Sequence, residues 1–345
     1  MQAGFLAPLT LVLAIASASA AQTPAPAYTA AESIALGAGE RWDYVTYDPV
    51  DHRAYVAHGD HVTVVDTEKR MTVGDIGTFP GGTHGIAIVH DAGIGYTDDA
   101  KAGEVIAFDL KTLQVMKKIK GDEDADGIVY DAPSRHVFVI NGDSGTITVI
   151  DPRVNDAVAT IRIGAGLEAA ETDNKGKLFV DGVEQHDIIV IDTKTNVVAA
   201  HYPLDGCERP HGIAVDAQAR RVFATCINKV MVVLDADSGK KIATLPIGAS
   251  SDGAAFDPVR KLVLSSNGEG TLSVIAEKDA AHFVAQADVA TAKGARTIAI
   301  DPASGTVFLP AATIAKVDAP EKPRGRPRVS YAPGSLKLLV LAPQK

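Results

Sequence analysis

The sequence predicts an all-β fold, a seven-bladed β-propeller whose last blade is closed by a strand from the N-terminal part of the chain. Three observations support this fold class. A polar residue followed by a short apolar strand recurs seven times, at intervals of 41 to 44 residues. A period of about 40 residues with strand character is typical of propellers, one blade per repeat. Seven repeats of this period occupy roughly 300 residues, so they form one domain.

The first 20 residues have the features of a secretory signal peptide. Residues 5–15 form an apolar run, and the small residues 18–20 precede an expected cleavage site before Ala21. The run is too short to remain in the bilayer as a span. We therefore expect residues 1–20 to be removed and the protein to be periplasmic or secreted. A flexible Pro/Ala-containing leader is predicted over residues 21–32, followed by the propeller over residues 33–345.

The fifth repeat illustrates how one repeat builds a blade. It predicts four short strands separated by turns, over residues 212–215, 221–225, 230–234 and 241–245. About twelve residues after its opening polar residue, every repeat carries a large apolar side chain. We expect these side chains to fill the gaps between blades. They are Tyr55, Tyr96, Phe138, Phe179, Phe223, Leu264 and Phe308.

The last repeat has three strands of its own, over residues 297–300, 307–309 and 336–341. The segment 33–36 is the simplest source of its outer strand, because that closure removes two exposed sheet edges. A Pro-rich and locally basic insertion occupies residues 312–333. A loop of this length is either disordered or functional, and it emerges on the face where it could fold over the central channel as a lid.

Strand motifs add a family resemblance. Three second strands read Tyr55-Val-Ala-His58, Phe138-Val-Ile-Asn141 and Phe223-Ala-Thr-Cys226, and two third strands read Ile147-Thr-Val-Ile-Asp151 and Ile188-Ile-Val-Ile-Asp192. They resemble the motifs of YVTN-type seven-bladed β-propellers, a family of exported, in part surface-layer-like, bacterial and archaeal proteins. The resemblance covers nearly all of the chain after the leader and implies the propeller fold. It implies little about activity, because the family is a scaffold class and a fold does not determine function.

The seven opening polar residues should ring one mouth of the central channel. They are Asp43, His84, Asp126, Glu168, His211, Asp252 and Arg296. Four carboxylates and two imidazoles in one funnel suit a divalent transition metal, or a small polar ligand held by mixed donors and acceptors. Alternatively, these side chains cap backbone groups and face water. Arg296 would either hold an anionic group of a ligand or neutralise Asp252 and Asp43 on the adjacent blades.

Two subsets of residues at this mouth of the channel, drawn from the ring and from the loops joining second and third strands, are candidate metal sites. The ring places His84 and His211 nearly across the axis, so their imidazoles would barely reach one ion. His211 with neighbouring carboxylates is easier geometrically, as is a set made of His58, Asp60 and His84 on adjacent blades. The residues of both subsets bind divalent transition metals in proteins.

Glu171 stands where the other repeats carry small or apolar residues. A buried Glu without a partner has a raised pKa or a cation nearby. We therefore consider Glu168, Glu171 and His211 candidate catalytic residues, with the two glutamates as an acid/base or metal-binding pair. The alternative is a Glu171 solvated by channel water.

Cys207 and Cys226 lie in two loops on one face of the fifth repeat. In an exported chain this favours a disulfide bond, which would brace the loop before His211. The alternative is a copper site formed by a thiolate and His211.

Composition narrows the function classes. The chain has 33 basic and 43 acidic side chains and a net charge of −10, which argues against nucleic-acid binding except through Arg324, Arg326 and Arg328. Walker, Rossmann, HExxH, nucleophile-elbow and haem-attachment motifs are absent from the sequence. We expect a monomeric, exported binding or interaction module, with a small molecule, a metal or a protein partner at the funnel. The alternative is a metal-dependent oxidoreductase, hydrolase or lyase that uses the same funnel.

Overall fold

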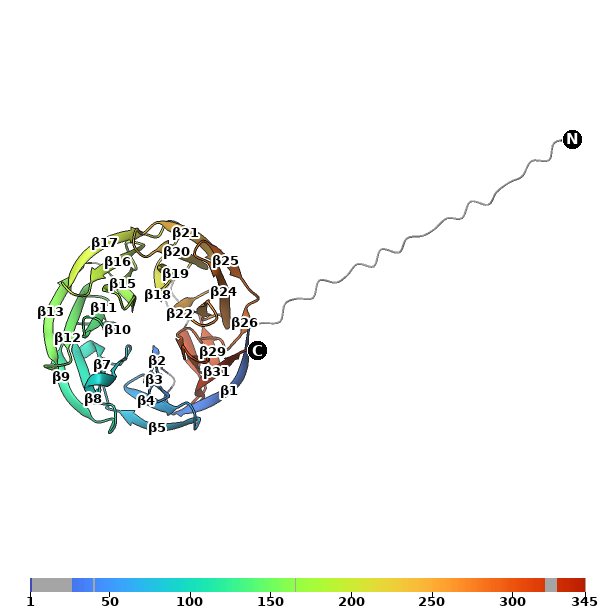
Figure 1. Cartoon of the computed structure of the whole chain (residues 1–345). Coiled ribbons are helices and arrows are strands. Elements are labelled where there is room, and N and C mark those ends of the chain that lie inside the picture. The colour runs from blue at the N-terminus through green and yellow to red at the C-terminus, as the bar shows by residue number, and fades with distance from the viewer. Residues whose placement is uncertain (2–26, 40, 165, 320–327, 345) are drawn as a thin grey trace.

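Seven antiparallel blades surround a central axis in the computed structural model, which describes residues 1, 27–39, 41–164, 166–319 and 328–344 (Figure 1). The predicted seven-bladed β-propeller is therefore confirmed. In each of the first six blades, four consecutive strands run outward from the axis to the rim. Short turns rich in Asp and Gly join them, as the repeat pattern predicts.

The first three blades contain the following strands. Blade 1 comprises β2 (Val45–Asp48), β3 (Arg53–His58), β4 (His61–Asp66) and β5 (Met71–Ile76). Blade 2 comprises β6 (Ala87–Val89), β7 (Ile94–Asp99), β8 (Glu104–Asp109) and β9 (Val115–Lys120). Its turns include two short 3-10 helices, η1 (His90–Ala92) and η2 (Ala100–Ala102). Blade 3 comprises β10 (Ala125–Asp131), β11 (His136–Asn141), β12 (Thr146–Asp151) and β13 (Asp156–Arg162).

The next three blades repeat this order. Blade 4 comprises β14 (Leu167–Thr172), β15 (Lys177–Gly182), β16 (Asp187–Asp192) and β17 (Val197–Pro203). Blade 5 comprises β18 (Pro210–Asp216), β19 (Arg221–Cys226), β20 (Val230–Asp235) and β21 (Lys241–Pro246). Blade 6 comprises β22 (Ser251–Asp257), β23 (Leu262–Asn267), β24 (Thr271–Asp279) and β25 (His282–Ala285), and the short β26 (Val289–Ala290) also pairs with β24.

Blade 7 is built from both ends of the chain. Its order from the axis outward is β27 (Ala299–Ile300), β28 (Val307–Ala311), β31 (Leu336–Pro343) and then β1 (Tyr28–Gly37). Strand β1 pairs antiparallel with β31, so the N-terminal closure predicted from the sequence is correct. The strand starts at Tyr28 and not at Ser33, so residues 28–32 belong to it and not to a leader. The predicted signal peptide and the rest of the leader fall in residues 2–26, outside the described residues.

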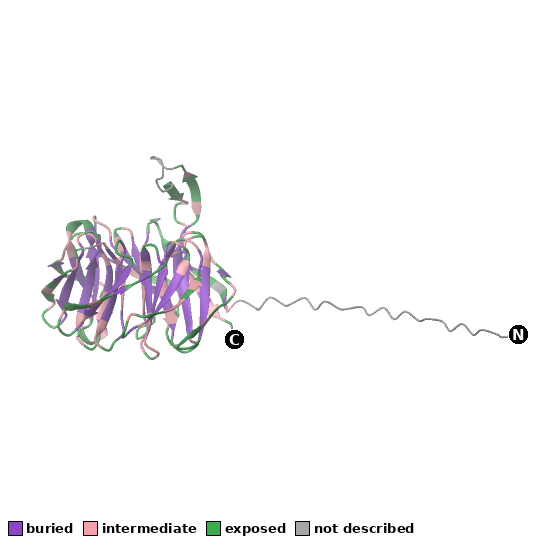
Figure 2. Ribbon diagram, turned by 90° about the horizontal axis from the view of Figure 1, so that it is seen from above, coloured by how far each residue is buried: buried purple, intermediate pink, exposed green. Residues whose placement is uncertain are grey.

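The insertion in blade 7 forms a two-stranded hairpin, β29 (Ile314–Asp318) and β30 (Arg328–Tyr331). The hairpin projects away from one face of the disc (Figure 2). It does not fold over the channel as the lid interpretation predicted. The Tyr331 ring packs edge-on against Trp42, with ring centroids 4.9 Å apart. The basic residues 322, 324 and 326 lie outside the described part of the chain.

The core lies between the blades. The large apolar residues predicted to fill these gaps are buried. Phe308 is the most exposed of them, at 3%, and Tyr55, Tyr96 and Phe223 are fully buried. Each of the main apolar clusters combines residues of adjacent blades; one joins Phe138 of blade 3 to Leu178 of blade 4. This packing fixes the angle between blades, and it thereby fixes where the opening residue of each repeat stands around the axis.

Candidate functional site

The ring residues of four consecutive blades lie at irregularities in the pairing of the innermost strands. Asp126, Glu168, His211 and Asp252 each fall where the register between the first and second strand of the blade shifts. A β-bulge leaves a residue out of the ladder and re-aims its side chain. The repeated bulge thus explains why these four side chains can turn toward the channel mouth while the strand continues below them.

Glycines next to the ring let neighbouring inner strands approach closely. A Cβ on Gly212 would come within 2.9 Å of the Gly253 Cα atom, and a Cβ on Gly253 would come within 3.2 Å of the Arg296 carbonyl oxygen. Side chains at these positions would force the blades apart. The glycine after His211 and the glycine after Asp252 therefore bring the polar side chains of blades 5, 6 and 7 within reach of one another.

His211 lies between two carboxylates from the adjacent blades. Its Nδ1 atom is 3.4 Å from Glu168 Oε2 and 3.6 Å from Asp252 Oδ1. The side chain of His211 is 13% exposed, and neither of its ring nitrogens makes a hydrogen bond to the described residues. One donor atom from each of the three residues lies within 4.8 Å of the other two. This set, Glu168, His211 and Asp252, is called the triad below.

The triad fits the ligand requirements of a first-row divalent metal. Zinc bonds of about 2.0 to 2.2 Å in a tetrahedron place neighbouring donor atoms about 3.3 to 3.6 Å apart. The two separations from His211 Nδ1, 3.4 and 3.6 Å, match that spacing. One imidazole and two carboxylates are also a donor set that such metals accept in proteins. Three protein ligands would leave a fourth position for water or a ligand.

Arg296 lies between the carboxylates of Asp252 and Asp43. Its Nε atom is 2.6 Å from Asp252 Oδ2, and one of its terminal nitrogens is 3.7 Å from Asp43 Oδ2. This is the neutralising arrangement considered from the sequence. Burial raises the pKa of Asp43 to about 7 although Arg296 and His84 oppose the shift. Because Arg296 contacts one oxygen of Asp252, the other oxygen faces His211.

His84 is held by its own blade, away from the triad. Its Nδ1 atom is 3.2 Å from Oδ2 of the fully buried Asp98, whose Oδ1 accepts the backbone N–H groups of His84 and Gly85. Burial alone would lower the pKa of His84, but the hydrogen bond and charge of Asp98 raise it to about 9. Among the described residues, His84 therefore joins neither His211 nor a second metal ligand set.

His58 and Asp60 are also apart from His84. The His58 ring bonds to Thr63 and to the Gly39 carbonyl oxygen, so both nitrogens are occupied. Asp60 bonds to His61 instead, at 2.9 Å. His58 and Asp60 line a separate crevice of about 360 Å³ beside Lys101. The predicted set of His58, Asp60 and His84 does not form a ligand cluster within the described residues.

Asp126 completes the ring without joining the triad. Burial raises its pKa well above the usual range, and the charges of Glu168 and Asp43 raise it further. The sequence did not predict the burial of a second acid near the ring. Asp181 on β15 is fully buried, its two oxygens make no hydrogen bond to described residues, and burial followed by the charge of Glu168 raises its pKa.

A cavity of about 390 Å³ occupies the central channel between the inner strands. Glu171 lines it, and burial raises the pKa of Glu171 to about 7 against the opposing effect of the hydrogen bond from the Thr172 N–H. Asp48 and His90 line it as well. With Asp51, these two form a second group of potential ligand atoms, but His90 Nε2 already bonds to Asp48, at 2.7 Å.

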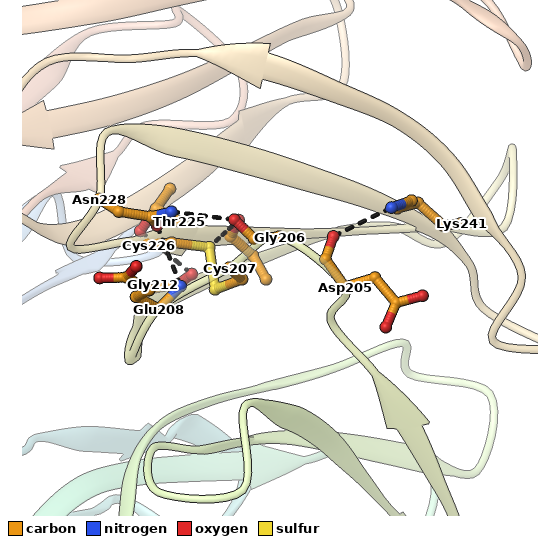
Figure 3. The surroundings of a disulfide bond; sticks show 10 residues. Asp205, Gly206, Cys207, Glu208, Gly212, Thr225, Cys226, Asn228 and Lys241 are labelled. Atoms are coloured by element: carbon orange, nitrogen blue, oxygen red, sulfur yellow. Dashed lines mark hydrogen bonds between the residues drawn. A yellow bond between two sulfur atoms is a disulfide. The ribbon is translucent and has the colours of Figure 1, made fainter.

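The predicted disulfide between Cys207 and Cys226 is present, with a Cα–Cα distance of 5.4 Å (Figure 3). Both cysteines are therefore unavailable as copper ligands in this form. The Asn228 side chain donates to the Gly206 carbonyl oxygen at 2.9 Å and accepts the Glu208 N–H at 3.0 Å, and Lys241 donates to the Asp205 carbonyl oxygen. The loop before His211 is thus fixed at several points, which restricts the position of the imidazole.

Comparison with known proteins supports the fold and does not identify a family. No protein-family model and no curated protein sequence matches the chain. A chain of Kuenenia stuttgartiensis hydrazine synthase is 16% identical with a TM-score of 0.68, covering 81% of this chain and 94% of that one.

Two further solved structures are similar. A chain of the mitotic checkpoint complex is 15% identical with a TM-score of 0.71, covering 88% of this chain and 96% of that one. The WD40 repeats of RRP9 are 12% identical with a TM-score of 0.76, covering 92% and 99%. At these identities the likeness concerns the fold alone. A search of the described residues finds no helix with the length and apolar character needed to cross a membrane.

Proposed function

We propose that the protein is an exported binding module, of the YVTN-type class that its strand motifs resemble, and that it holds a divalent transition metal ion at the triad. One observation carries the proposal: donor atoms from Glu168, His211 and Asp252, on three consecutive blades, lie within 4.8 Å of one another. The disulfide bond supports export, because disulfides persist in oxidising compartments.

The metal would serve to present a coordination position at the channel mouth. Three protein ligands satisfy part of the coordination shell of zinc or a similar ion, and the remaining position can take an oxygen or nitrogen atom of a small ligand. Arg296 would act on the metal indirectly, because it holds the second oxygen of Asp252. The small ligand or partner would therefore dock on the face that carries the hairpin.

Metal titration of the mature protein tests the proposal. Chelator-treated protein is titrated with Zn²⁺ in a calorimeter, beside His211→Ala and beside His84→Ala as the matched control. The control removes the other ring imidazole, which Asp98 holds outside the triad. We expect one ion per chain for the unchanged protein and for His84→Ala. We expect affinity to fall by more than about a hundredfold in His211→Ala, since losing a ligand exceeds the effect of losing its outer partner. Equal affinities in all three proteins would refute the assignment.

A metal-dependent enzyme is the second candidate, and Glu171 is the observation that favours it. A carboxyl group with a pKa near 7 is suited to general acid/base work at neutral pH, and Glu171 lines the cavity of the same channel. A hydrolase, lyase or oxidoreductase would need both the metal and this group. Turnover of a candidate substrate that requires added Zn²⁺ and disappears in Glu171→Gln would favour this reading over a simple binding module.

A further inference from the structure

The central cavity has the build of a small-molecule site. Its volume of about 390 Å³ lies within the range of about 300 to 1,000 Å³ common for such sites. The inner strands of several blades supply mainly small and apolar walls. These include Ile86, Ile128, Ala170, Ile213, Ala254 and Ile298.

Glu171 is a carboxyl group on this wall without a cationic partner in the described part of the chain. Its Oε1 atom accepts the Thr172 backbone N–H at 3.0 Å. No Lys, Arg or His of the described residues lies within ion-pair distance of it, whereas the other acid and base of the cavity, Asp48 and His90, pair with each other. A carboxylate beside apolar walls is costly unless a cation meets it.

We infer that the central cavity binds a small apolar amine, with the ammonium group against the Glu171 carboxylate and the hydrocarbon body against the strand walls. An inorganic cation is less suited to this position, because such ions need several oxygen ligands and one carboxylate dominates this wall. A neutral hydrocarbon would use the walls but leave the carboxylate unpaired. An amine meets both requirements.

The test compares two ligands that share a ring and differ in the polar group. Cyclohexylamine and cyclohexanol are titrated into chelator-treated mature protein at fixed ionic strength, and binding is followed by calorimetry or ligand-observed NMR. We expect the amine to bind at least about tenfold more tightly, as charged hydrogen bonds exceed neutral ones. We expect Glu171→Gln to remove that preference and leave the weak binding of the alcohol unchanged.

Glu277→Gln is the matched control. Glu277 is a buried glutamate on β24 that does not line the cavity, and its replacement changes the net charge equally. The amine preference should survive in this variant. Loss of the preference in Glu277→Gln as well, or its retention in Glu171→Gln, would show that the acidic surface attracts amines without a specific site and would overturn the inference.

The inference and the metal proposal can fail separately. The ligand titrations use metal-free protein, so absence of a zinc site does not affect their outcome. The comparison of amine with alcohol on the unchanged protein also needs no variant, and equal affinities or no binding of either ligand would refute an amine site at Glu171. The fold of each variant is checked by circular dichroism and urea unfolding.

Discussion

Replacement of Tyr28 should show that closure of the propeller begins well before the segment that the sequence pattern identified. Tyr28 is fully buried at the start of β1, in an apolar cluster with Leu341 of β31 and Leu272 of blade 6. Truncating a large buried aromatic side chain to Ala costs about 3 to 5 kcal/mol through lost burial and the cavity left behind. This is a large part of the total stability of about 5 to 15 kcal/mol that is usual for a folded protein.

The hydroxyl group of Tyr28 should contribute much less than its ring. Tyr28 donates to Asp257 Oδ2 over 3.4 Å, a long hydrogen bond. Asp257 also accepts the backbone N–H groups of Val259 and Arg260 and an Arg260 guanidinium N–H. Removing the hydroxyl therefore leaves no unpaired charge, and Tyr28→Phe should cost about 1 kcal/mol or less.

Equilibrium urea unfolding of the mature chain, followed by circular dichroism, measures both effects. Thr29→Ala is the control, since Thr29 is the exposed neighbour of Tyr28 in the same strand. We expect Tyr28→Ala to lower the free energy of unfolding by about 3 to 5 kcal/mol, and Thr29→Ala by less than about 0.5 kcal/mol. A loss below about 1 kcal/mol for Tyr28→Ala would show that the first residues of β1 do not contribute to closure.

Two further predictions concern other blades. Replacing both cysteines by Ser should cost about 3 kcal/mol by the chain-entropy estimate for a separation of 19 residues. Urea unfolding of the variant beside the unchanged protein measures this difference, and the two proteins should converge in reductant, where the unchanged protein also lacks the disulfide. Burial, followed by the hydrogen bond with Asp216, raises the pKa of Glu277 from 4.5 to about 7. The folded state therefore holds this proton more tightly, and stability falls as pH rises from about 4.5 to 7. Glu277→Gln should remove on the order of 2 kcal/mol of that fall after allowance for solvent screening, and parallel stability curves from pH 5 to 8 would contradict this assignment.

The fold was predictable because a propeller repeats one local pattern. Each repeat supplies its own turns, strand lengths and gap-filling residue, so seven weak signals support one another. The start of β1 was less accessible. The composition of residues 22–27 suggests a leader, and Tyr28 is only the first aromatic residue after it. The burial of this single side chain against blades 6 and 7 depends on tertiary packing. The repeat pattern of the sequence does not predict it.

The sequence could predict which residues lie near the channel mouth, but not which of them contact one another. The period places Glu168, His211 and Asp252 on consecutive blades, and His211 with neighbouring carboxylates was one of the two metal sets that the sequence offered. The alternative set of His58, Asp60 and His84 does not come together, because local contacts hold its members apart. Both ring nitrogens of His58 bond to Thr63 and Gly39, Asp98 holds Nδ1 of His84, and the three residues do not gather as a ligand cluster within the described part of the chain. Such choices depend on rotamers and on bulges, which spacing alone does not specify.

Comparison of blades within this one ring explains why we propose blade 5 as the place for a metal. Blades 5 and 7 both lie between two blades that carry an acidic ring residue. In blade 7 the gap holds Arg296, a permanent cation that contacts both Asp252 and Asp43. In blade 5 the gap holds His211, whose Nδ1 atom lies 3.4 Å from Glu168 and 3.6 Å from Asp252 without a hydrogen bond to either.

Blade 2 shows what a histidine does when its own blade supplies a counter-ion. There Asp98 bonds to the His84 ring and also accepts the backbone N–H groups of His84 and Gly85. The residue at the same place in blade 5 is Thr225, whose hydroxyl bonds to the Gly212 carbonyl oxygen and carries no charge. His211 is thus left facing Glu168 and Asp252 without a carboxylate behind it. A divalent cation in this gap would neutralise the two flanking carboxylates and occupy the imidazole nitrogen that faces them, much as Arg296 neutralises the pair two blades further on.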